Sequence, residues 1–339
     1  MNRSVIAVAA LAACLAAGAR AAECKLVRIV EWPVRIKAGH VVVDGEINGR
    51  KVDITLDTGA SRSAIVRSAA ERLELPRHDA KGYRMFGIGG ELAVEIADVA
   101  EFKLGGTLIK DWRVIVAGDA GTDLLLGEDF LSKFDVEFDL AHGAVRLYEP
   151  RDCRDASLAY WTTDVPGEVE FERIDEDRPR ITFTVRINGR PIQALLDSGA
   201  GWSLLSKQDA AALGVTPDTP GVDAAGTGTG LGARAVDAWI GPFESFVIGN
   251  ETISDVRIGF ADLWKDSTYE STGSHVRRKS EGQQPMLVGY DFLRAHRLLV
   301  AHSQRKLYFT HSGGTVFQPK RTPPKTPDAA NETAAKPGN

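Results

Sequence analysis

Residues 52–63 read Val-Asp-Ile-Thr-Leu-Asp-Thr-Gly-Ala-Ser-Arg-Ser, a short apolar run that leads into an acid on a glycine turn. Its centre is Asp57-Thr58-Gly59-Ala60, and the same unit returns 140 residues later as Asp197-Ser198-Gly199-Ala200. A single Asp-(Thr/Ser)-Gly tripeptide would be an ordinary turn, because Asp and Gly are turn formers. The preceding turns, 47–50 and 187–190, both read Ile-Asn-Gly-Arg and keep the same spacing. The chain therefore carries two copies of one unit, each presenting one carboxylate.

Each copy has the same order of predicted elements around its acid. Two strands joined at Asn-Gly, the strongest short hairpin signal, precede the acid, and apolar residues at helical spacing follow it. The predicted hairpin strands are 41–47 with 51–56 and 181–187 with 191–196; the predicted helices are 63–75 and 206–213. An earlier edge strand, 27–36, is interrupted by Pro33.

A glycine-rich stretch follows in each copy and is predicted to form a mobile hairpin tip that a ligand can approach closely. The residues assigned to these two flaps are Phe86, Gly87, Ile88, Gly89, Gly226, Thr227 and Gly228. Further along, Leu124-Leu125-Leu126-Gly127 and Met286-Leu287-Val288-Gly289 are apolar strands that run into short helices. The offset there has grown to 162 residues, and the extra residues fall mainly in 262–284, a polar stretch predicted to be an exposed loop.

The ends of the chain suggest export. Residues 1–21 have a positive start, a small apolar run and an Ala19-Arg20-Ala21 cleavage site, as in a secretory signal peptide. A periplasmic or secreted location is therefore expected. Leu11-Ala12-Ala13-Cys14 leaves a second reading open, a membrane-anchored lipoprotein acylated at Cys14. The last residues are rich in Pro, Lys, Thr and Ala, which predicts a disordered tail.

The predicted organisation has five parts. They are the signal peptide 1–21, a first lobe 22–152, a connector 153–167, a second lobe 168–312 and the tail 313–339. Cys24 and Cys153 remain after removal of the signal, and an even pair in an exported protein predicts a disulfide. The chain has 41 basic and 46 acidic residues, which argues against nucleic acid as a partner.

The combination of an apolar strand, Asp-Thr-Gly-Ala, a glycine-rich flap and a later apolar-apolar-Gly strand resembles the retropepsin-like aspartic proteases. Two such units in one chain resemble the bacterial tandem members of that group, over about residues 40–150 and 180–312. The resemblance implies a mainly β protein with two homologous, closed, barrel-like lobes about a pseudo-twofold axis. Because both halves are covalently joined, a monomer is expected to suffice.

The resemblance also implies an exported endopeptidase that acts on extended or unfolded polypeptide. Asp57 and Asp197 would activate water as a dyad sharing one proton, because two close carboxylates cannot both ionise. Gly59 and Gly199 would allow the tight approach of the two loops. The hydroxyls of Thr58 and Ser198 would hydrogen-bond across the axis and fix the carboxylates.

One departure from the repeat weakens the case for strong activity. Ser61 follows the first Asp-Thr-Gly-Ala, whereas Gly201 follows the second, so any hydrogen bond from this position to its Asp would exist on one side only. A non-catalytic peptide-binding or envelope-scaffolding module therefore stays open as an alternative. No cofactor or metal is expected, since the seven His are scattered and form no familiar metal motif. Residues 201–205 lack the final Gly of a serine nucleophile elbow.

Overall fold

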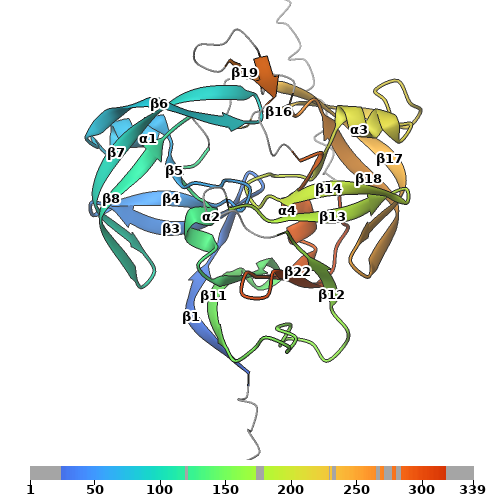
Figure 1. Ribbon diagram of the computed structural model, residues 1–339, viewed down its shortest axis with the longest axis horizontal. Coiled ribbons are helices and arrows are strands. Elements are labelled where there is room, and N and C mark those ends of the chain that lie inside the picture. The colour runs from blue at the N-terminus through green and yellow to red at the C-terminus, as the bar shows by residue number, and fades with distance from the viewer. Residues whose placement is uncertain are drawn as a thin grey trace, which may run out of the picture.

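The structure is a computed structural model that describes residues 24–118, 121–172, 179–228, 230, 234–264, 268–270, 277–279 and 284–317. Two β lobes lie side by side, with a shared sheet below them and a small two-stranded sheet above (Figure 1). The predicted signal peptide and residues 318–339 of the predicted tail lie outside the described residues. None of the helices in the described part of the chain has the length and hydrophobicity of a membrane span.

The first lobe is built on one sheet with strand order β2-β3-β4-β9-β5-β8-β7-β6. An additional β3–β7 pairing closes this sheet on itself. Its strands are β2 (Arg35–Lys37), β3 (His40–Ile47), β4 (Arg50–Leu56), β5 (Ala64–Ile65), β6 (Arg77–Gly87), β7 (Gly90–Leu104), β8 (Thr107–Val116) and β9 (Leu124–Leu126). Alternating apolar residues of these strands fill the interior, which confirms a closed, mainly β lobe.

The second lobe repeats that plan, with the order β13-β14-β21-β15-β18-β17-β16 and a closing β13–β17 pairing. Its strands are β13 (Thr182–Ile187), β14 (Arg190–Leu196), β15 (Leu204–Ser206), β16 (Asp223–Gly228), β17 (Val236–Ile248), β18 (Glu251–Ala261) and β21 (Met286–Val288). The short helices are α1 (Arg67–Arg72) and α2 (Glu128–Leu131) in the first lobe and α3 (Lys207–Ala212) and α4 (Tyr290–Leu293) in the second.

A third sheet, to which both lobes contribute, joins them from below with the order β1-β11-β10-β22-β23-β12. The strands are β1 (Lys25–Pro33), β10 (Asp135–Asp139), β11 (Ala144–Arg151), β12 (Gly167–Glu170), β22 (His296–Ala301) and β23 (Lys306–His311), and a 3₁₀ turn, η1 (Leu140–His142), links β10 to β11. At its centre β10 pairs antiparallel with β22, so Glu137 lies opposite Leu299. The two lobes, related by a pseudo-twofold axis, are therefore joined through a sheet to which each contributes strands.

The predicted helix over 63–75 is wrong at both ends. Ala64 and Ile65 form β5, which pairs with β8 and β9, and only Arg67–Arg72 is helical. The apolar spacing of 65–73 fits a helix, but Ile65 and Val66 are β-branched and good strand formers, and both neighbouring strands are available to pair with this segment.

The loop predicted over 262–284 is also corrected in part. Its described segments are β19 (Thr268–Glu270) and β20 (Arg277–Lys279), which pair with each other as a small antiparallel sheet. In Figure 1 this sheet lies above the gap between the lobes, and β19 lies against β7 of the first lobe. The basic triplet at 277–279 is therefore a strand.

The second lobe extends beyond the predicted boundary at residue 312. Phe317 is fully buried, with its ring centroid 4.7 Å from that of Phe246 and 6.0 Å from that of Phe292. Gly313 and Gly314 both have positive φ, and this turn brings the following apolar pair back onto the lobe. The prediction failed because two apolar residues carry little weight in a polar tail.

The disulfide between Cys24 and Cys153 is present and confirms that prediction. It joins the start of β1 to the segment that follows β11. These two strands are antiparallel neighbours at the edge of the shared sheet, with Lys25 opposite Arg151. The disulfide therefore links the start of the edge strand β1 covalently to the end of its neighbour β11.

Candidate active site

The two acidic loops leave their lobes at equivalent points. Asp57 follows β4, and its backbone N–H donates to the carbonyl of Leu126, 2.9 Å away. Asp197 follows β14, and its N–H donates to the carbonyl of Val288, also at 2.9 Å. In each lobe the neighbour is the parallel apolar strand that runs into a Gly, as the repeat suggested.

Four reciprocal hydrogen bonds lock the loops together. Thr58 Oγ1 donates to the carbonyl of Leu196 (2.9 Å) and accepts from the N–H of Ser198 (3.0 Å). Ser198 Oγ donates to the carbonyl of Leu56 (2.7 Å) and accepts from the N–H of Thr58 (3.0 Å). Both hydroxyls are buried, so every donor and acceptor in this set depends on the opposite lobe. The cross-axis bonds implied by the resemblance are present.

Gly59 and Gly199 are required by proximity and not by backbone conformation. Neither has a positive φ. A Cβ on Gly59 would lie 2.5 Å from Oδ1 and 2.7 Å from Oδ2 of Asp197, and a Cβ on Gly199 would meet the oxygens of Asp57 at the same distances. The expected close approach of the two loops is present, and each glycine makes room for the other lobe's carboxyl group.

The carboxyl group of Asp197 lies against Gly59 and that of Asp57 lies against Gly199, so each acid reaches into the opposite loop. Burial is the main cause that raises the pKa of both, and for Asp197 the charge of Asp57 raises it further. The N–H groups of Gly59 and Ala60 donate to Asp57 Oδ1 at 3.0 Å and oppose that rise in pKa. The pair can therefore hold one proton between two oxygens.

The Ser61/Gly201 difference leaves these bonds in place. The N–H groups of Gly199 and Ala200 lower the pKa of Asp197, as those of Gly59 and Ala60 lower the pKa of Asp57. A Cβ on Gly201 would have its nearest contact at 3.7 Å, so a side chain could be accommodated there. Both acids therefore have backbone donors that favour their ionised form, although Ser61 has no counterpart at Gly201.

Two further hydrogen-bond networks, one in each lobe, support the acidic loops. They were not predicted from the sequence. Ser63 Oγ donates to Asp129 Oδ1 (2.7 Å) and accepts from the N–H of Gly127 (3.0 Å). In the second lobe the same bonds join three buried groups: Ser203 Oγ donates to Asp291 Oδ1 (2.6 Å) and accepts from the N–H of Gly289 (2.9 Å).

The repeat contained the signal for these networks. A Ser stands six residues after each dyad acid, and an Asp stands two residues after each Gly of the apolar-apolar-Gly strands. Burial raises the pKa of Asp291 to about 6, although the donors from Ser203 and Phe292 oppose this. His40, at the start of β3, was also missed; its charge lowers the pKa of Asp57.

The flap tips from the two lobes meet. Ile88 and Gly89 form the turn between β6 and β7, and the carbonyl of Gly89 accepts from the N–H of Arg234, 3.3 Å away. A Cβ on Gly230 would lie 2.7 Å from the Cβ and carbonyl oxygen of Ile88. The first flap therefore closes against the second.

The other predicted flap residues are strand residues. Phe86 and Gly87 pair with Glu91 and Gly90 in the flap hairpin, and the side chain of Phe86 lies outside the described part of the structure. The remaining three, Gly226, Thr227 and Gly228, were assigned to a tip but belong to exposed β16, paired with β17.

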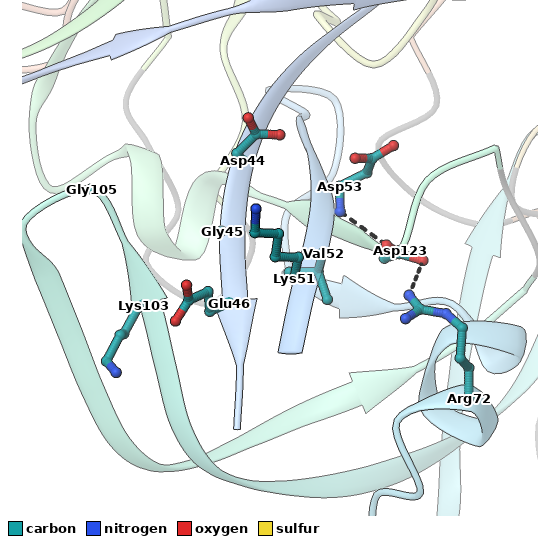
Figure 2. Close-up of a pocket in the computed structure, with 10 residues that line it drawn as sticks. All are labelled: Asp44, Gly45, Glu46, Lys51, Val52, Asp53, Arg72, Lys103, Gly105 and Asp123. Carbon is teal, nitrogen blue, oxygen red and sulfur yellow. Dashed lines mark hydrogen bonds and ion pairs between the residues drawn. The ribbon is translucent and has the colours of Figure 1, made fainter. Parts of the chain in front are cut away.

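A separate polar depression of about 670 Å³ lies on the first lobe and includes neither dyad acid. Figure 2 shows its charged side chains around β3 and β4. Asp123 accepts a hydrogen bond from the N–H of Asp53 (2.9 Å) and forms an ion pair with Arg72 (2.7 Å). These lining groups are therefore already partnered within the protein. Among the described residues no group of three or more His, Cys, Asp or Glu could hold a metal ion.

Comparison with known families finds an aspartyl protease in each lobe. Residues 43–133 match the family described as "gag-polyprotein putative aspartyl protease", and residues 183–292 match the family described as "Aspartyl protease". A search of curated proteins found no match. Each matched segment contains one Asp-(Thr/Ser)-Gly-Ala loop and the apolar-apolar-Gly strand beneath it. With its two closed lobes and paired acidic loops, the chain belongs to the retropepsin-like aspartic proteases, as a tandem two-lobe member.

Proposed function

We propose that the chain is an exported aspartic endopeptidase that hydrolyses extended or unfolded polypeptide, with Asp57 and Asp197 as its catalytic dyad. The observation that carries the proposal is the placement of each carboxyl group against the glycine of the opposite loop, in loops locked by reciprocal hydrogen bonds. A single-chain monomer would contain the whole site, since each lobe supplies one acid.

The chemistry needs one group that accepts a proton and one that donates a proton. The ionised carboxylate would take a proton from water as the water oxygen attacks the scissile carbonyl carbon. The protonated carboxyl would give its proton to the carbonyl oxygen, forming a tetrahedral diol. Collapse of the diol breaks the C–N bond, and a proton passes to the leaving amine. The raised pKa of the pair favours the required one-proton state.

Substrate would lie between the dyad and the flaps. Flap strands β6 and β7 form a hairpin whose tip reaches the opposite lobe, so an extended peptide could pair with flap backbone as an added strand. A folded protein could not present its backbone in this way. The expected substrates are therefore flexible or denatured segments.

The test uses Asp57→Asn and Asp197→Asn separately on a denatured protein substrate, from about pH 3 to 8. Either change should abolish cleavage, because the two acids act as one unit. Circular dichroism of each variant controls for folding. Half the wild-type activity in either variant would refute the shared-proton dyad. Peptide binding by the wild type without turnover at any pH would instead favour the non-catalytic module.

Export has its own test. Mass spectrometry of the mature N-terminus should show cleavage after Ala21 and an unmodified chain start. An acylated Cys14 would instead show that the protein is a membrane-anchored lipoprotein.

A further inference from the structure

His40, the first residue of β3, lies opposite Asp57 in the sheet of the first lobe. Val42 of β3 pairs with Thr55 of β4, and continuing the same register by two residues places His40 across from Asp57. The side chains of directly opposite residues in an antiparallel pair share a face, with Cβ atoms about 5 Å apart. The register therefore brings an imidazole ring to the first acid of the dyad.

Both side chains lie on the face that is turned away from the core of the lobe. Val41 packs in that core, so His40, next to it in the strand, lies on the other face. Leu56 also packs in the core, which puts Asp57 on the same face as His40. His40 is half-buried, and within the part of the chain that the structure describes its ring has no hydrogen-bond or ion-pair partner. The ring is therefore free to gain or lose its proton beside Asp57.

The turn that precedes His40 packs against the second lobe. Ala38 and Gly39 both have positive φ and form the turn between β2 and β3. A Cβ on Gly39 would lie 3.3 Å from the Cα of Gly201, so this turn is in contact with the second acidic loop. The contact fixes the start of β3 beside both acids. It lies at Gly201, where the second copy of the repeat departs from the first.

Few other charges compete with the dyad for the imidazole. The titratable and charged groups on the elements around His40 and Asp57 are Lys37, Asp53, Asp57, Glu128 and Asp197. Lys37, opposite His40 in β2, is ion-paired with Asp53, 2.8 Å away. Glu128 is fully buried, and its burial raises its pKa well above the usual value. The dyad is therefore the charge on which His40 acts, and the charge of His40 lowers the pKa of Asp57.

The second lobe has an arginine at the equivalent position. The N–H of Leu196 donates to the carbonyl of Ile181 (3.0 Å), and the next pair in that register is Arg180 with Asp197. Arginine stays charged at every working pH, whereas histidine ordinarily gains its charge at about pH 6.5. The two acids therefore differ in the base that lies opposite them, and only the base opposite Asp57 can change its charge.

We propose that His40 is a positioning residue that acts on cleavage through Asp57, and that its protonation extends the pH range of the enzyme toward acid. The proposal rests on the proposed function. An imidazolium opposite Asp57 favours the carboxylate, so it opposes the second proton that would inactivate the dyad. At higher pH the ring is neutral and does not promote loss of the remaining proton. His40 thus widens the pH range at its acid side without narrowing it at its alkaline side.

The first test compares two replacements of His40 by the pH dependence of kcat/KM, which reports the dyad of the free enzyme. His40→Gln removes the charge, so the acid limb should move to higher pH by about one unit while the alkaline limb stays in place. His40→Arg introduces the residue of the second copy and is charged at every pH. Its acid limb should match the wild type, and its alkaline limb should move to lower pH by about one unit.

The second test needs no cleavage. The ring protons of His40 are followed by NMR from about pH 4 to 8 in the wild type and in Asp57→Asn/Asp197→Asn, with His40→Gln identifying the signal. Electrostatic coupling is reciprocal, so removal of the negative charge of the dyad should move the titration of His40 to lower pH by about one unit. Circular dichroism of each variant controls for folding.

An unchanged titration of His40 in the double variant would overturn the proposal, because the charge of the dyad would then not reach the ring. Equal effects of His40→Gln and His40→Arg on both limbs would also overturn it. So would a loss of kcat at every pH without movement of either limb, since His40 would then only pack the turn. If the wild type cleaves no peptide, the proposed function fails, and the NMR titration alone decides whether His40 and the dyad are coupled.

Discussion

Glu128 Oε2 lies 3.5 Å from His302 Nε2, across the boundary between the two lobes. The carboxyl group is fully buried, the imidazole is 5% exposed, and none of their polar side-chain atoms has a hydrogen-bond partner in the structure. Burial raises the pKa of Glu128 well above its usual value, helped by the charges of Asp57 and Asp129, and lowers the pKa of His302 to about 4. Burial therefore favours the uncharged form of both groups.

The first prediction concerns pH and His302. The unfolded chain binds a proton on this histidine near pH 6.5, whereas the folded protein resists it until about pH 4. Stability should therefore fall as the pH drops through that window, by roughly 3 kcal/mol in all. Urea unfolding at several pH values should show this slope in the wild type and a weaker one in His302→Gln. A His302 pKa above 6.5 by NMR would instead indicate an ion pair with Glu128.

Glu128 should contribute a pH dependence of stability opposite to that of His302, and Glu128→Gln should remove it. A carboxyl with a raised folded-state pKa loses stability as the pH rises above its unfolded value of about 4.5, because the unfolded chain ionises first. The amide cannot ionise, so the variant should be more stable than the wild type at pH 8 and similar to it at pH 4. The same unfolding series measures this. Tyr290 occupies the equivalent site in the second lobe, so Tyr290→Phe is the matched control, without a carboxyl group to remove.

Thr58→Val tests the lock between the acidic loops. Valine matches the shape of threonine but leaves the Leu196 carbonyl and the Ser198 N–H without their buried partner. The expected cost is about 2–4 kcal/mol of stability, with cleavage slowed on the order of 10²-fold by loss of carboxyl alignment. Thr58→Ser keeps the hydroxyl found in the second copy and should stay near wild type. Equal effects of the two changes would show that packing, not hydrogen bonding, matters here.

The internal repeat explains which parts of the site could be predicted from the sequence. Asp57 and Asp197 could be paired because identical hairpin and turn signals flank both, and such signals are local. The close approach of the loops at Gly59 was predicted, but the group that Gly59 makes room for, the Asp197 carboxyl, belongs to the other lobe and could not be identified from local sequence. The Ser63–Asp129 and Ser203–Asp291 pairs were visible in the repeat, but each bond joins segments that are distant along the chain and has no local signature.

The shared sheet could not be predicted from the sequence for a similar reason. The strands 135–139 and 296–301 pair with each other across the lobes, and nothing local in either sequence specifies this pairing. Phe317 was assigned to the tail because its partners Phe246 and Phe292 are distant along the chain. Local chemistry predicted the elements and the acids, whereas contacts between lobes required the structure.

Gly59→Ala tests the steric role of that glycine. Because an added methyl would overlap the Asp197 carboxyl, the loops must separate, and cleavage should fall by on the order of 10² or more. Gly106→Ala is the matched control, because its φ is not positive and nothing lies within 4 Å of the added carbon. Activity and thermal unfolding of the two variants should therefore diverge. Full activity in Gly59→Ala would mean that the carboxyl groups need not touch.

The last prediction concerns Glu137, a fully buried carboxylate in β10 that ties the lobes together. Its Oε1 accepts from Arg297 Nε of the second lobe (2.6 Å), and its Oε2 accepts from the hydroxyls of Tyr148 (2.9 Å) and Tyr160 (2.7 Å). Glu137→Leu would leave Arg297 facing a buried apolar group, at an expected cost of about 3–5 kcal/mol. Glu137→Gln retains an acceptor and should cost less.

The position of Glu137 makes the result informative about the two-lobe design. It lies opposite Leu299 at the centre of the shared sheet, so its loss should weaken the junction between the lobes more than the core of either lobe. Hydrogen exchange should therefore speed up in β10 and β22 of Glu137→Leu before it changes in β4 or β14. Because the dyad is assembled from both lobes, cleavage should decline together with protection of the junction. Uniform destabilisation of all strands would show that the lobes unfold as a single unit and that Glu137 has no special role in joining them.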